Sequence, residues 1–338
     1  MLFRSTITAR PRGSNLLYSP EMNPARREPT IRVQYLEVDA DHAGQRLDNY
    51  LFASCKGVPK SHLYRLVRQG QIRINRGRRP AHYRLQLGDV VRIPPLRMAA
   101  QATVAVEPIS LEDRILYEDN DLLVVDKPAG LAVHGGSGVK LGLIEALRTR
   151  YARPRFLELV HRLDRDTSGC LMVAKRRTAL IALHADLRAG RIEKRYIALV
   201  RDHWTGRSHQ IKAALQKLRL RSGERMVEVS RGGKAAQTRF TPKRQLAGST
   251  LCEIELLTGR THQVRVHAAY AGHPVAGDQK YGDREFNRTM RERGLRRLFL
   301  HAQRLRFKHP RSGELMDVSA PLPSELSELL DYLEHDEA

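Results

Sequence analysis

Short apolar runs separated by charged or turn-forming residues make up most of the chain, and their lengths predict many strands and few helices. Strand-like length and β-branched content mark the runs at 115–117, 122–126, 156–160, 170–174, 196–200 and 251–257. Helical spacing of apolar positions is expected over about 141–151, 177–189 and 323–334. Strands interspersed with occasional helices indicate an α+β domain rather than regular βαβ repeats.

A smaller unit precedes this domain. Its expected elements are a strand, two helices and two further strands, over about 33–38, 47–53, 61–68, 71–75 and 87–93. Ser61 is expected to cap the second helix and Gly70 to stop it. The chain is therefore expected to begin with a basic disordered tail at 1–30, followed by the small unit at 31–95 and a linker at 96–112. The large unit would follow at 113–325, and a C-terminal helix end with an acidic tail at 326–338.

The charge balance indicates a polyanionic partner. The 338 residues include 59 Lys and Arg against 37 Asp and Glu, which gives a formal net charge of +22. Because the basic residues are spread over the whole length, we expect the folded units to display the positive charge on their surfaces. Such a positive surface favours binding to a nucleic acid. An anionic membrane is a weaker candidate, since no basic amphipathic helix stands out.

The absence of some sequence patterns narrows the class of protein further. No stretch approaches 18 apolar residues and the N-terminus lacks the apolar core of a secretory signal, so we expect no membrane partner and a cytoplasmic location in a bacterial source. Cys55, Cys170 and Cys252 are widely spaced and include no Cys-x-x-Cys pair, which argues against a disulfide framework and a zinc site.

The strongest candidate for chemistry is the sequence HRLDRDTSG at residues 161–169. It lies between two strand-like runs, and its Asp-Thr-Ser-Gly stretch predicts the turn of a hairpin. The carboxylate of Asp164 and the guanidinium of Arg162 would then lie at a strand end, which packing alone explains poorly. The alternative is a charged hairpin at the surface.

These segments resemble the motifs of the RluA family of RNA pseudouridine synthases. The HRLD-x-x-T-S-G pattern at 161–169 carries the nucleophilic aspartate of that family. Further motifs match KPAGLAVH, KRY, TGRTHQVRVH and GDQKYG at 127–134, 194–196, 258–267 and 277–282. The resemblance implies a mixed, largely antiparallel sheet with flanking helices and a central cleft, and an isomerase that converts uridine in RNA to pseudouridine without a cofactor.

The resemblance also implies a role for each candidate residue. Asp164 would be the catalytic carboxylate, and Arg265 its partner, keeping it ionised and oriented. Tyr196 would stack on the target uracil, although alone a tyrosine there is more often a core residue. Arg162, two residues before Asp164 and so expected on the same strand face, would fill the stack that the uridine leaves. The KPAGLAVH motif would shape the floor of the cleft.

A second copy of the third motif lies at 205–212 with the sequence TGRSHQIK. We interpret it as a chance repeat or a basic loop facing RNA, because only the later copy follows a clear strand and precedes GDQKYG. Histidines of the motifs could ligate a metal, but supporting acidic ligands at known spacings are lacking, so no metal is expected. These histidines are His134, His161, His262 and His267.

Residues 31–95 resemble the S4 RNA-binding module. The matching patterns are R-L-D at 46–48, G-x-I-x-I-N at 70–75 and G-D at 88–89. Basic residues gather on its second helix and the turn that follows, where they can contact phosphates. The expected RNA contacts are Lys60, Arg65, Arg68, Arg73 and Arg76. A solvated charged helix is the alternative.

Several runs of the sequence are typical of family members that modify 23S ribosomal RNA, so the resemblance implies 23S rRNA or a large-subunit precursor as partner. We expect a monomer with no small-molecule cofactor. A non-catalytic S4-type ribosome assembly factor would fit the charge and the small unit equally well. A metal-dependent nuclease using Asp164 and Asp166 would need more carboxylates than the motifs offer.

Overall fold

The computed structural model describes residues 32–55, 57–96, 111–135, 142–150, 156–219 and 225–336. The chain divides into two compact units with the boundary between Ala102 and Thr103. The tail expected at 1–30 and most of the linker expected at 96–112 lie outside the described residues.

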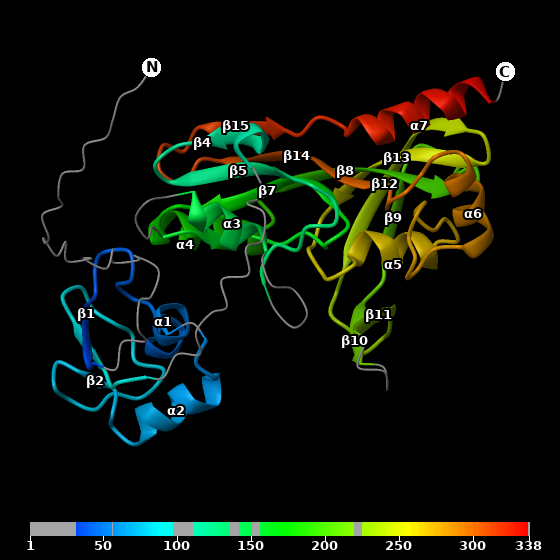
Figure 1. The fold of residues 1–338 in the computed structure, drawn as a ribbon. Helices are drawn as coiled ribbons and strands as arrows, with labels where there is room; N and C mark the ends of the chain where they lie inside the picture. Colours follow the sequence, from blue (N-terminus) through cyan, green and yellow to red (C-terminus); the bar gives the residue numbers. More distant parts are fainter. Residues whose placement is uncertain are drawn as a thin grey trace, which may run out of the picture. The chain divides into compact units, whose positions relative to one another are not determined.

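The N-terminal unit is a three-stranded antiparallel sheet with two helices (Figure 1). Its strand order is β1-β3-β2. Its elements are β1 (Gln34–Glu37), α1 (Leu47–Ser54), α2 (Lys60–Arg68), β2 (Arg73–Ile74) and β3 (Val90–Ile93). Aliphatic side chains from both helices and the sheet form its core, among them Leu47, Leu51, Leu63, Ile72 and Val91.

The start of α2 differs from the sequence prediction. The helix begins at Lys60 after Pro59, whose φ of −56° suits a helix start, so the prediction that Ser61 caps it is wrong. Gly70 follows the helix with a φ of +67°, a left-handed conformation that glycine adopts easily. The predicted stop is therefore confirmed.

The strand after α2 is shorter than predicted. Asn75 and Arg76 have φ values of 50° and 68°, so the chain turns where the sequence predicted a continuing strand. The Asn75 amide donates to Asp89 Oδ1 at 2.7 Å, and its Oδ1 accepts from the Val90 N–H at 2.8 Å. This turn ties the end of β2 to the start of β3.

The C-terminal unit is built on one ten-stranded mixed sheet (Figure 1). The strand order is β4-β5-β7-β14-β8-β13-β12-β9, with β6 paired to β7 and β15 to β14. Among the described strands only β7 and β14 pair in parallel. The strands are β4 (Ile115–Glu118), β5 (Leu122–Lys127), β6 (Glu158–Leu159), β7 (Ser168–Ala174), β8 (Glu193–Arg201), β9 (His209–Lys212), β12 (Gln237–Leu246), β13 (Ser249–Leu256), β14 (Leu300–Lys308) and β15 (Leu315–Ser319). The expected α+β architecture is confirmed.

Helices and one separate hairpin flank this sheet. They are η1 (Glu112–Arg114), α3 (Leu143–Thr149), α4 (Arg177–Arg188), α5 (Gln263–Tyr270), α6 (Arg284–Glu292), α7 (Ser324–His335), and the pair β10 (Leu215–Arg219) and β11 (Arg225–Val229). Leu326, Leu330 and Leu333 of α7 are buried in one cluster with Phe286 of α6. The division expected at residue 325 therefore falls within a packed helix. No described helix is long and apolar enough to cross a membrane.

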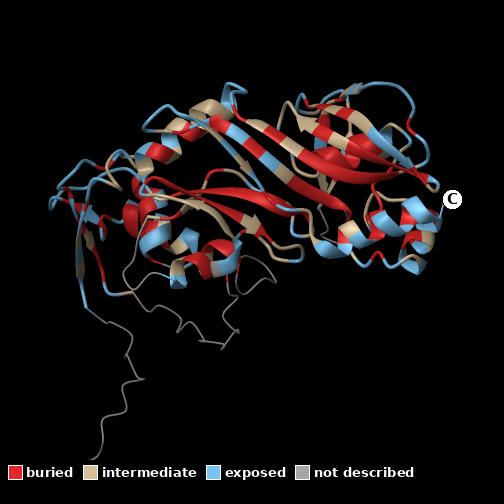
Figure 2. Ribbon diagram, turned by 90° about the horizontal axis from the view of Figure 1, so that it is seen from above, coloured by how far each residue is buried: buried red, intermediate tan, exposed pale blue. Residues whose placement is uncertain are grey.

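Strand β8 lies in the middle of the sheet and is buried on both faces (Figure 2). Tyr196, Ala198 and Val200 point into one apolar cluster, and Ile197 and Leu199 point into another. This alternation confirms that Tyr196 shares a face with Ala198 and Val200.

β6 pairs with β7 as predicted, but the turn expected at 166–169 is wrong, because the tight turn lies earlier, where the Thr167 N–H donates to the Asp164 carbonyl at 3.2 Å. Ser168 and Gly169 belong to β7 and lie opposite His301 and Ala302 of β14. A Cβ on Gly169, whose φ is +106°, would lie 2.3 Å from the Ala302 carbonyl oxygen. Only glycine allows the two parallel strands to approach this closely.

Candidate active site

Asp164 lies in the connection between β6 and β7, at the start of a tight turn. The Thr167 N–H donates to the Asp164 carbonyl at 3.2 Å. The fully buried Lys127 at the end of β5 donates to the carbonyls of Pro128 at 2.8 Å and of Leu131 and Arg165 at 2.9 Å. Its ammonium thus fixes the KPAG turn to the turn that carries Asp164.

Arg265 lies in the first turn of α5, and Gln263 explains why the helix begins there. The Gln263 Oε1 accepts from the Arg260 N–H at 3.0 Å and from the Thr258 hydroxyl at 2.7 Å. Its Nε2 donates to the Gln237 carbonyl at 2.9 Å. These bonds close the TGRTHQ loop and orient the helix that follows.

The guanidinium of Arg265 bridges two carboxylates. Its Nε and Nη2 donate to Asp278 at 2.7 Å each, and its Nη1 lies 3.6 Å from Asp164 Oδ2. The N–H groups of Lys280 and Tyr281 also donate to Asp278 Oδ1, at 2.9 and 3.0 Å. Asp278 therefore holds Arg265 in a fixed orientation that aims one N–H edge at Asp164.

Burial and charge have opposite effects on the pKa values of Arg265 and Asp278. Burial alone would lower the pKa of Arg265, but the hydrogen bonds and charge of Asp278, together with the charge of Asp164, raise it. Burial would raise the pKa of Asp278, but its bonds to Arg265 hold it below the usual range. Both groups stay ionised, and the guanidinium of Arg265 is the charge that faces Asp164.

Besides Arg265, His262 is a second side chain close to Asp164 that can carry a positive charge. Its Nε2 lies 3.8 Å from Asp164 Oδ1, and its Nδ1 lies 2.7 Å from the Tyr281 hydroxyl. That hydroxyl also accepts from the Val227 N–H at 3.0 Å and has one proton that it can donate to Nδ1. Burial lowers the pKa of His262, although Asp164 acts in the opposite direction. Nε2 is the ring nitrogen of His262 that faces Asp164.

A cavity of about 720 Å³ is lined by both Asp164 and Tyr196. Its other lining residues include Leu163, Val264, Leu300 and Lys194. Burial, followed by the charge of Asp164, raises the pKa of Tyr196, so the phenol stays neutral. The cavity combines an aromatic ring, apolar walls and a carboxylate.

A larger cavity of about 1260 Å³ is also lined by Asp164 and is rich in arginine. Asp164, His262, Arg265 and Arg162 line both cavities. Residues 162–164 are not in a strand, so the expected shared strand face of Arg162 and Asp164 is wrong. The exposed Arg162 nevertheless lies at the rim between the cavities.

The earlier copy of the third motif lies elsewhere. Its residues 209–212 form β9, an edge strand paired with β12, and Lys212 is exposed. Neither cavity beside Asp164 is lined by Lys212. The structure brings Arg265, not Lys212, to Asp164.

The expected phosphate contacts of the N-terminal unit are all exposed: Lys60, Arg65, Arg68, Arg73 and Arg76. The ammonium of Lys60 lies 4.7 Å from the centre of the Phe52 ring, and Arg65 contacts His62 Nδ1 at 2.7 Å. The Arg73 Nε donates to the Gly70 carbonyl at 3.1 Å. The side chains are thus presented by a helix and a turn of defined geometry.

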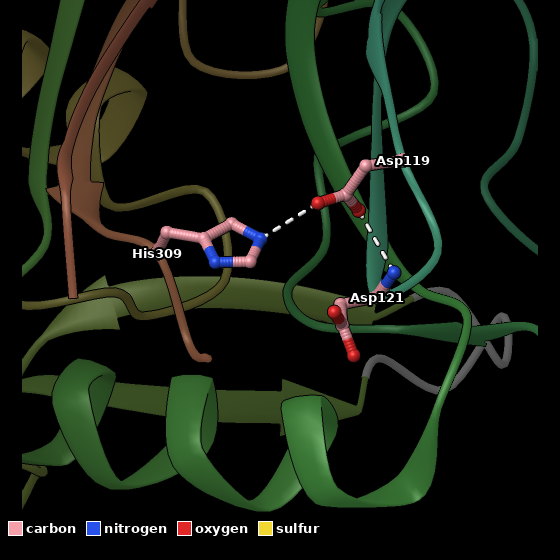
Figure 3. A group of neighbouring side chains, drawn as sticks. All are labelled: Asp119, Asp121 and His309. Atoms are coloured by element: carbon pink, nitrogen blue, oxygen red, sulfur yellow. Dashed lines mark hydrogen bonds and ion pairs between the residues drawn. The ribbon is translucent and has the colours of Figure 1, made fainter. Parts of the chain in front are cut away.

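Among the described residues, one group of acidic and histidine side chains is close enough to share a metal ion, and it lies away from Asp164: Asp119, Asp121 and His309 (Figure 3). His309 Nδ1 accepts from the Ser312 N–H at 3.1 Å, so Nε2 carries the proton and donates to Asp119 at 2.8 Å. Arg311 pairs with Asp121 at 2.8 Å. Hydrogen bonds and this arginine account for the group, which joins the β4–β5 and β14–β15 connections.

Sequence reasoning missed Asp278, His262 and Tyr281 as members of the site. Asp278 and Tyr281 lie in the GDQKYG motif, which carried no assigned role, and His262 lies next to the loop-closing Gln263. The signal available was an acid and a phenol at fixed spacing within a matched motif. Their partners depend on packing between α5 and the 277–282 turn, which spacing does not reveal.

Comparison with known proteins agrees with this geometry. A family described as RNA pseudouridylate synthase matches residues 121–270, and the S4 domain matches residues 45–91. The chain is 50% identical over 319 residues to a ribosomal large subunit pseudouridine synthase C of Pasteurella multocida, covering 92% of this chain and 98% of the relative. It is 51% identical over 311 residues to the protein of that name from Escherichia coli, covering 90% and 98%.

Solved structures give the same result for the larger unit. Human RNA pseudouridylate synthase domain containing 4 matches with a TM-score of 0.55 and 26% identity, covering 66% of this chain and 94% of that one. Human RNA pseudouridylate synthase domain containing 1 matches with a TM-score of 0.53 and 30% identity, covering 68% and 97%. The expected resemblance is confirmed: this chain belongs to the RluA family of RNA pseudouridine synthases and carries an S4 domain ahead of the synthase domain.

Proposed function

We propose that this chain converts specific uridines of 23S ribosomal RNA to pseudouridine, with Asp164 as the catalytic carboxylate. The observation that supports this proposal most directly is the ion pair of Asp164 and Arg265. Both residues line two cavities, one of which contains Tyr196. The names of the bacterial relatives support the large-subunit substrate. The proposal includes a monomer that acts in the cytoplasm on rRNA or a large-subunit precursor.

The reaction breaks the N1–C1′ bond, turns the uracil and joins C5 to C1′. The uracil loses its C5 proton and gains one at N1, so nothing is oxidised or hydrolysed, and no cofactor is proposed. Arg265 keeps Asp164 ionised and oriented, and Tyr196 stacks on the uracil. Extruding the uridine from a duplex costs a few kcal/mol, and Arg162 at the cavity rim fills the vacated stack.

We assign His262 a positioning role in this reaction. The chain of bonds from Val227 through Tyr281 holds the proton on Nε2, which faces Asp164. We expect His262→Ala to slow the single-turnover rate by about 100-fold, the size of loss that a small misplacement of a reacting group can cause. His262→Gln, whose side-chain amide can place a donor where Nε2 lies, should retain much more of the rate. NMR of labelled histidine should show the Nε2–H tautomer in the wild type and its loss in Tyr281→Phe. Equal defects for the Ala and Gln variants would contradict this role.

The S4 unit is proposed to bind phosphates rather than to assist the chemistry. Replacing Arg65, Arg68 and Arg73 by Gln in the full chain should weaken RNA binding and lower the slope of log affinity against log salt by roughly 2–3. The single-turnover rate at saturating RNA should fall much less than the affinity. Normal binding combined with a large loss of rate would contradict this division of roles.

The alternative of a non-catalytic assembly factor explains the S4 unit and the positive charge, but not the Asp164–Arg265 pair beside Tyr196. Carbodiimide mapping of rRNA from a strain lacking this protein distinguishes the two. The proposal expects particular 23S uridines to lose the pseudouridine signal and to regain it only with an active gene. Unchanged modification alongside defective subunit assembly would favour the assembly factor.

A further inference from the structure

Helix α6 carries three arginines on one face. Arg284, Arg288 and Arg291 are separated by four and three residues, so they lie within about 60° of one another around the helix axis. All three are exposed, whereas Phe286 and Met290 on the opposite side are buried.

The three arginines outnumber the two glutamates of the helix, Glu285 and Glu292, which are also exposed. Within the described residues, Arg284 and Arg291 form no ion pair, and Arg288 approaches only Glu285, at 3.6 Å, with both side chains strongly exposed. Such a pair is screened by water and salt and contributes little. The face therefore presents a net positive charge.

The same face leads into the large cavity. Arg291 at the end of α6 and the exposed Arg296 beyond it line the cavity of about 1260 Å³ that contains Asp164. The arginines of α6 spread over about 10 Å along its axis, a length over which a stacked RNA strand presents roughly three phosphates.

Helix α6 is also fixed to the active site. The Asn287 Oδ1 accepts from the Gly277 N–H at 2.8 Å, and its Nδ2 donates to the Asp278 carbonyl at 2.9 Å. Asp278 is the residue that orients Arg265. The position of the arginine face is thereby set relative to Asp164.

We propose that this face of α6 binds the phosphate backbone of the substrate RNA and guides the strand into the cavity at Asp164. The proposal rests on the proposed function in that RNA is the substrate. It adds a phosphate-binding surface within the catalytic unit, on a helix beyond the residues 121–270 that match the synthase family. Arginine suits this role because its planar fork can contact phosphate oxygens in pairs.

The test compares the wild type with a variant in which Arg284, Arg288 and Arg291 are replaced by Gln. Filter binding to an unmodified 23S rRNA transcript over a range of salt should show a roughly tenfold to hundredfold loss of affinity and a salt slope lower by about 2–3. Replacing the same three arginines by Lys should restore the slope. The single-turnover rate at saturating RNA should change much less than the affinity.

A control variant removes the same number of charges elsewhere, replacing Arg239, Arg244 and Arg304 by Gln. These arginines are paired with Glu255, Glu334 and Asp317. The control should lower the slope less than the α6 variant. Equal slopes for the two variants, or an α6 variant that binds normally, would overturn the proposal. Because binding is measured apart from isomerisation, an inactive wild type would instead count against the proposed function.

Discussion

Asp164→Asn should fold and bind RNA yet lose uridine isomerisation by on the order of 10⁴-fold or more, the size of effect seen when the central group of an active site is removed. The amide keeps the shape of the side chain but has no negative charge and is a far weaker nucleophile. The fold should survive because Arg265 retains its two 2.7 Å bonds to Asp278. Single-turnover assays at saturating RNA measure the loss.

Asp166→Asn is the matched control for this prediction. Asp166 lies two residues away and pairs with Arg165 at 3.2 Å, with nearly half of its side chain exposed. It should retain substantial activity, because neither Arg265 nor His262 faces it in an ion pair among the described residues. An active Asp164→Asn variant beside an inactive Asp166→Asn variant would reverse the assignment.

Arg265→Ala should abolish turnover and also destabilise the fold. It removes the partner of Asp164 and leaves Asp278, which is 1% exposed, as an unpaired buried carboxylate. Removing one member of a buried charge pair typically lowers the free energy of unfolding by about 3–5 kcal/mol. Thermal melts measure this loss, and rates should be taken well below the lowered melting temperature.

Lys212→Ala is the control, because Lys212 holds the corresponding place in the earlier copy of the motif and is exposed on β9. It should reduce RNA affinity slightly and leave the melting temperature near that of the wild type. Equal defects in the two variants would mean that the later copy is not the catalytic one.

The dependence of protein stability on pH, measured into the acid range, provides a further test of the Arg265–Asp278 ion pair. The pKa of Asp278 is lowered in the folded state, so the pair stabilises the fold above the unfolded pKa of about 3.9. This contribution is lost as the pH falls through the lowered folded value. The difference in the free energy of unfolding between the wild type and Asp278→Asn should therefore become smaller at acid pH.

The pattern of apolar residues predicted those strands that are formed mainly through burial of their apolar side chains. The run before Asp164 and the alternation around Tyr196 gave the strands, and the motif gave the pairing of Asp164 with Arg265. Helix α5 was not predicted, because Val264, Arg265 and Val266 alternate as they would in a strand. The Gln263 side chain donates to the Gln237 carbonyl and the Thr238 hydroxyl, which are distant in sequence, and these bonds fix the start of the helix there.

The rest of the site depends on contacts that spacing does not encode. Ser168 looks like a turn residue but is buried, because the Arg297 guanidinium donates to its hydroxyl at 2.6 Å and His301 Nδ1 lies 2.9 Å from it. The turn that carries Asp278 to Arg265 is held by Asn287 of α6, which donates to the Asp278 carbonyl at 2.9 Å. Both residues lie in matched motifs, which locate them without revealing their partners.

Release of tritium from RNA labelled at uracil C5 is the most direct test of the claim that the cavity at Asp164 isomerises uridine. The proposed reaction removes the C5 proton and needs no added metal, so wild-type enzyme in excess EDTA should release label from an unmodified 23S rRNA transcript, and pseudouridine should appear in equal amount. Asp164→Asn, shown to be folded and to bind the same RNA, should release none. Folded wild-type protein that binds the transcript but releases no label, or an equal release by Asp164→Asn, would contradict the account.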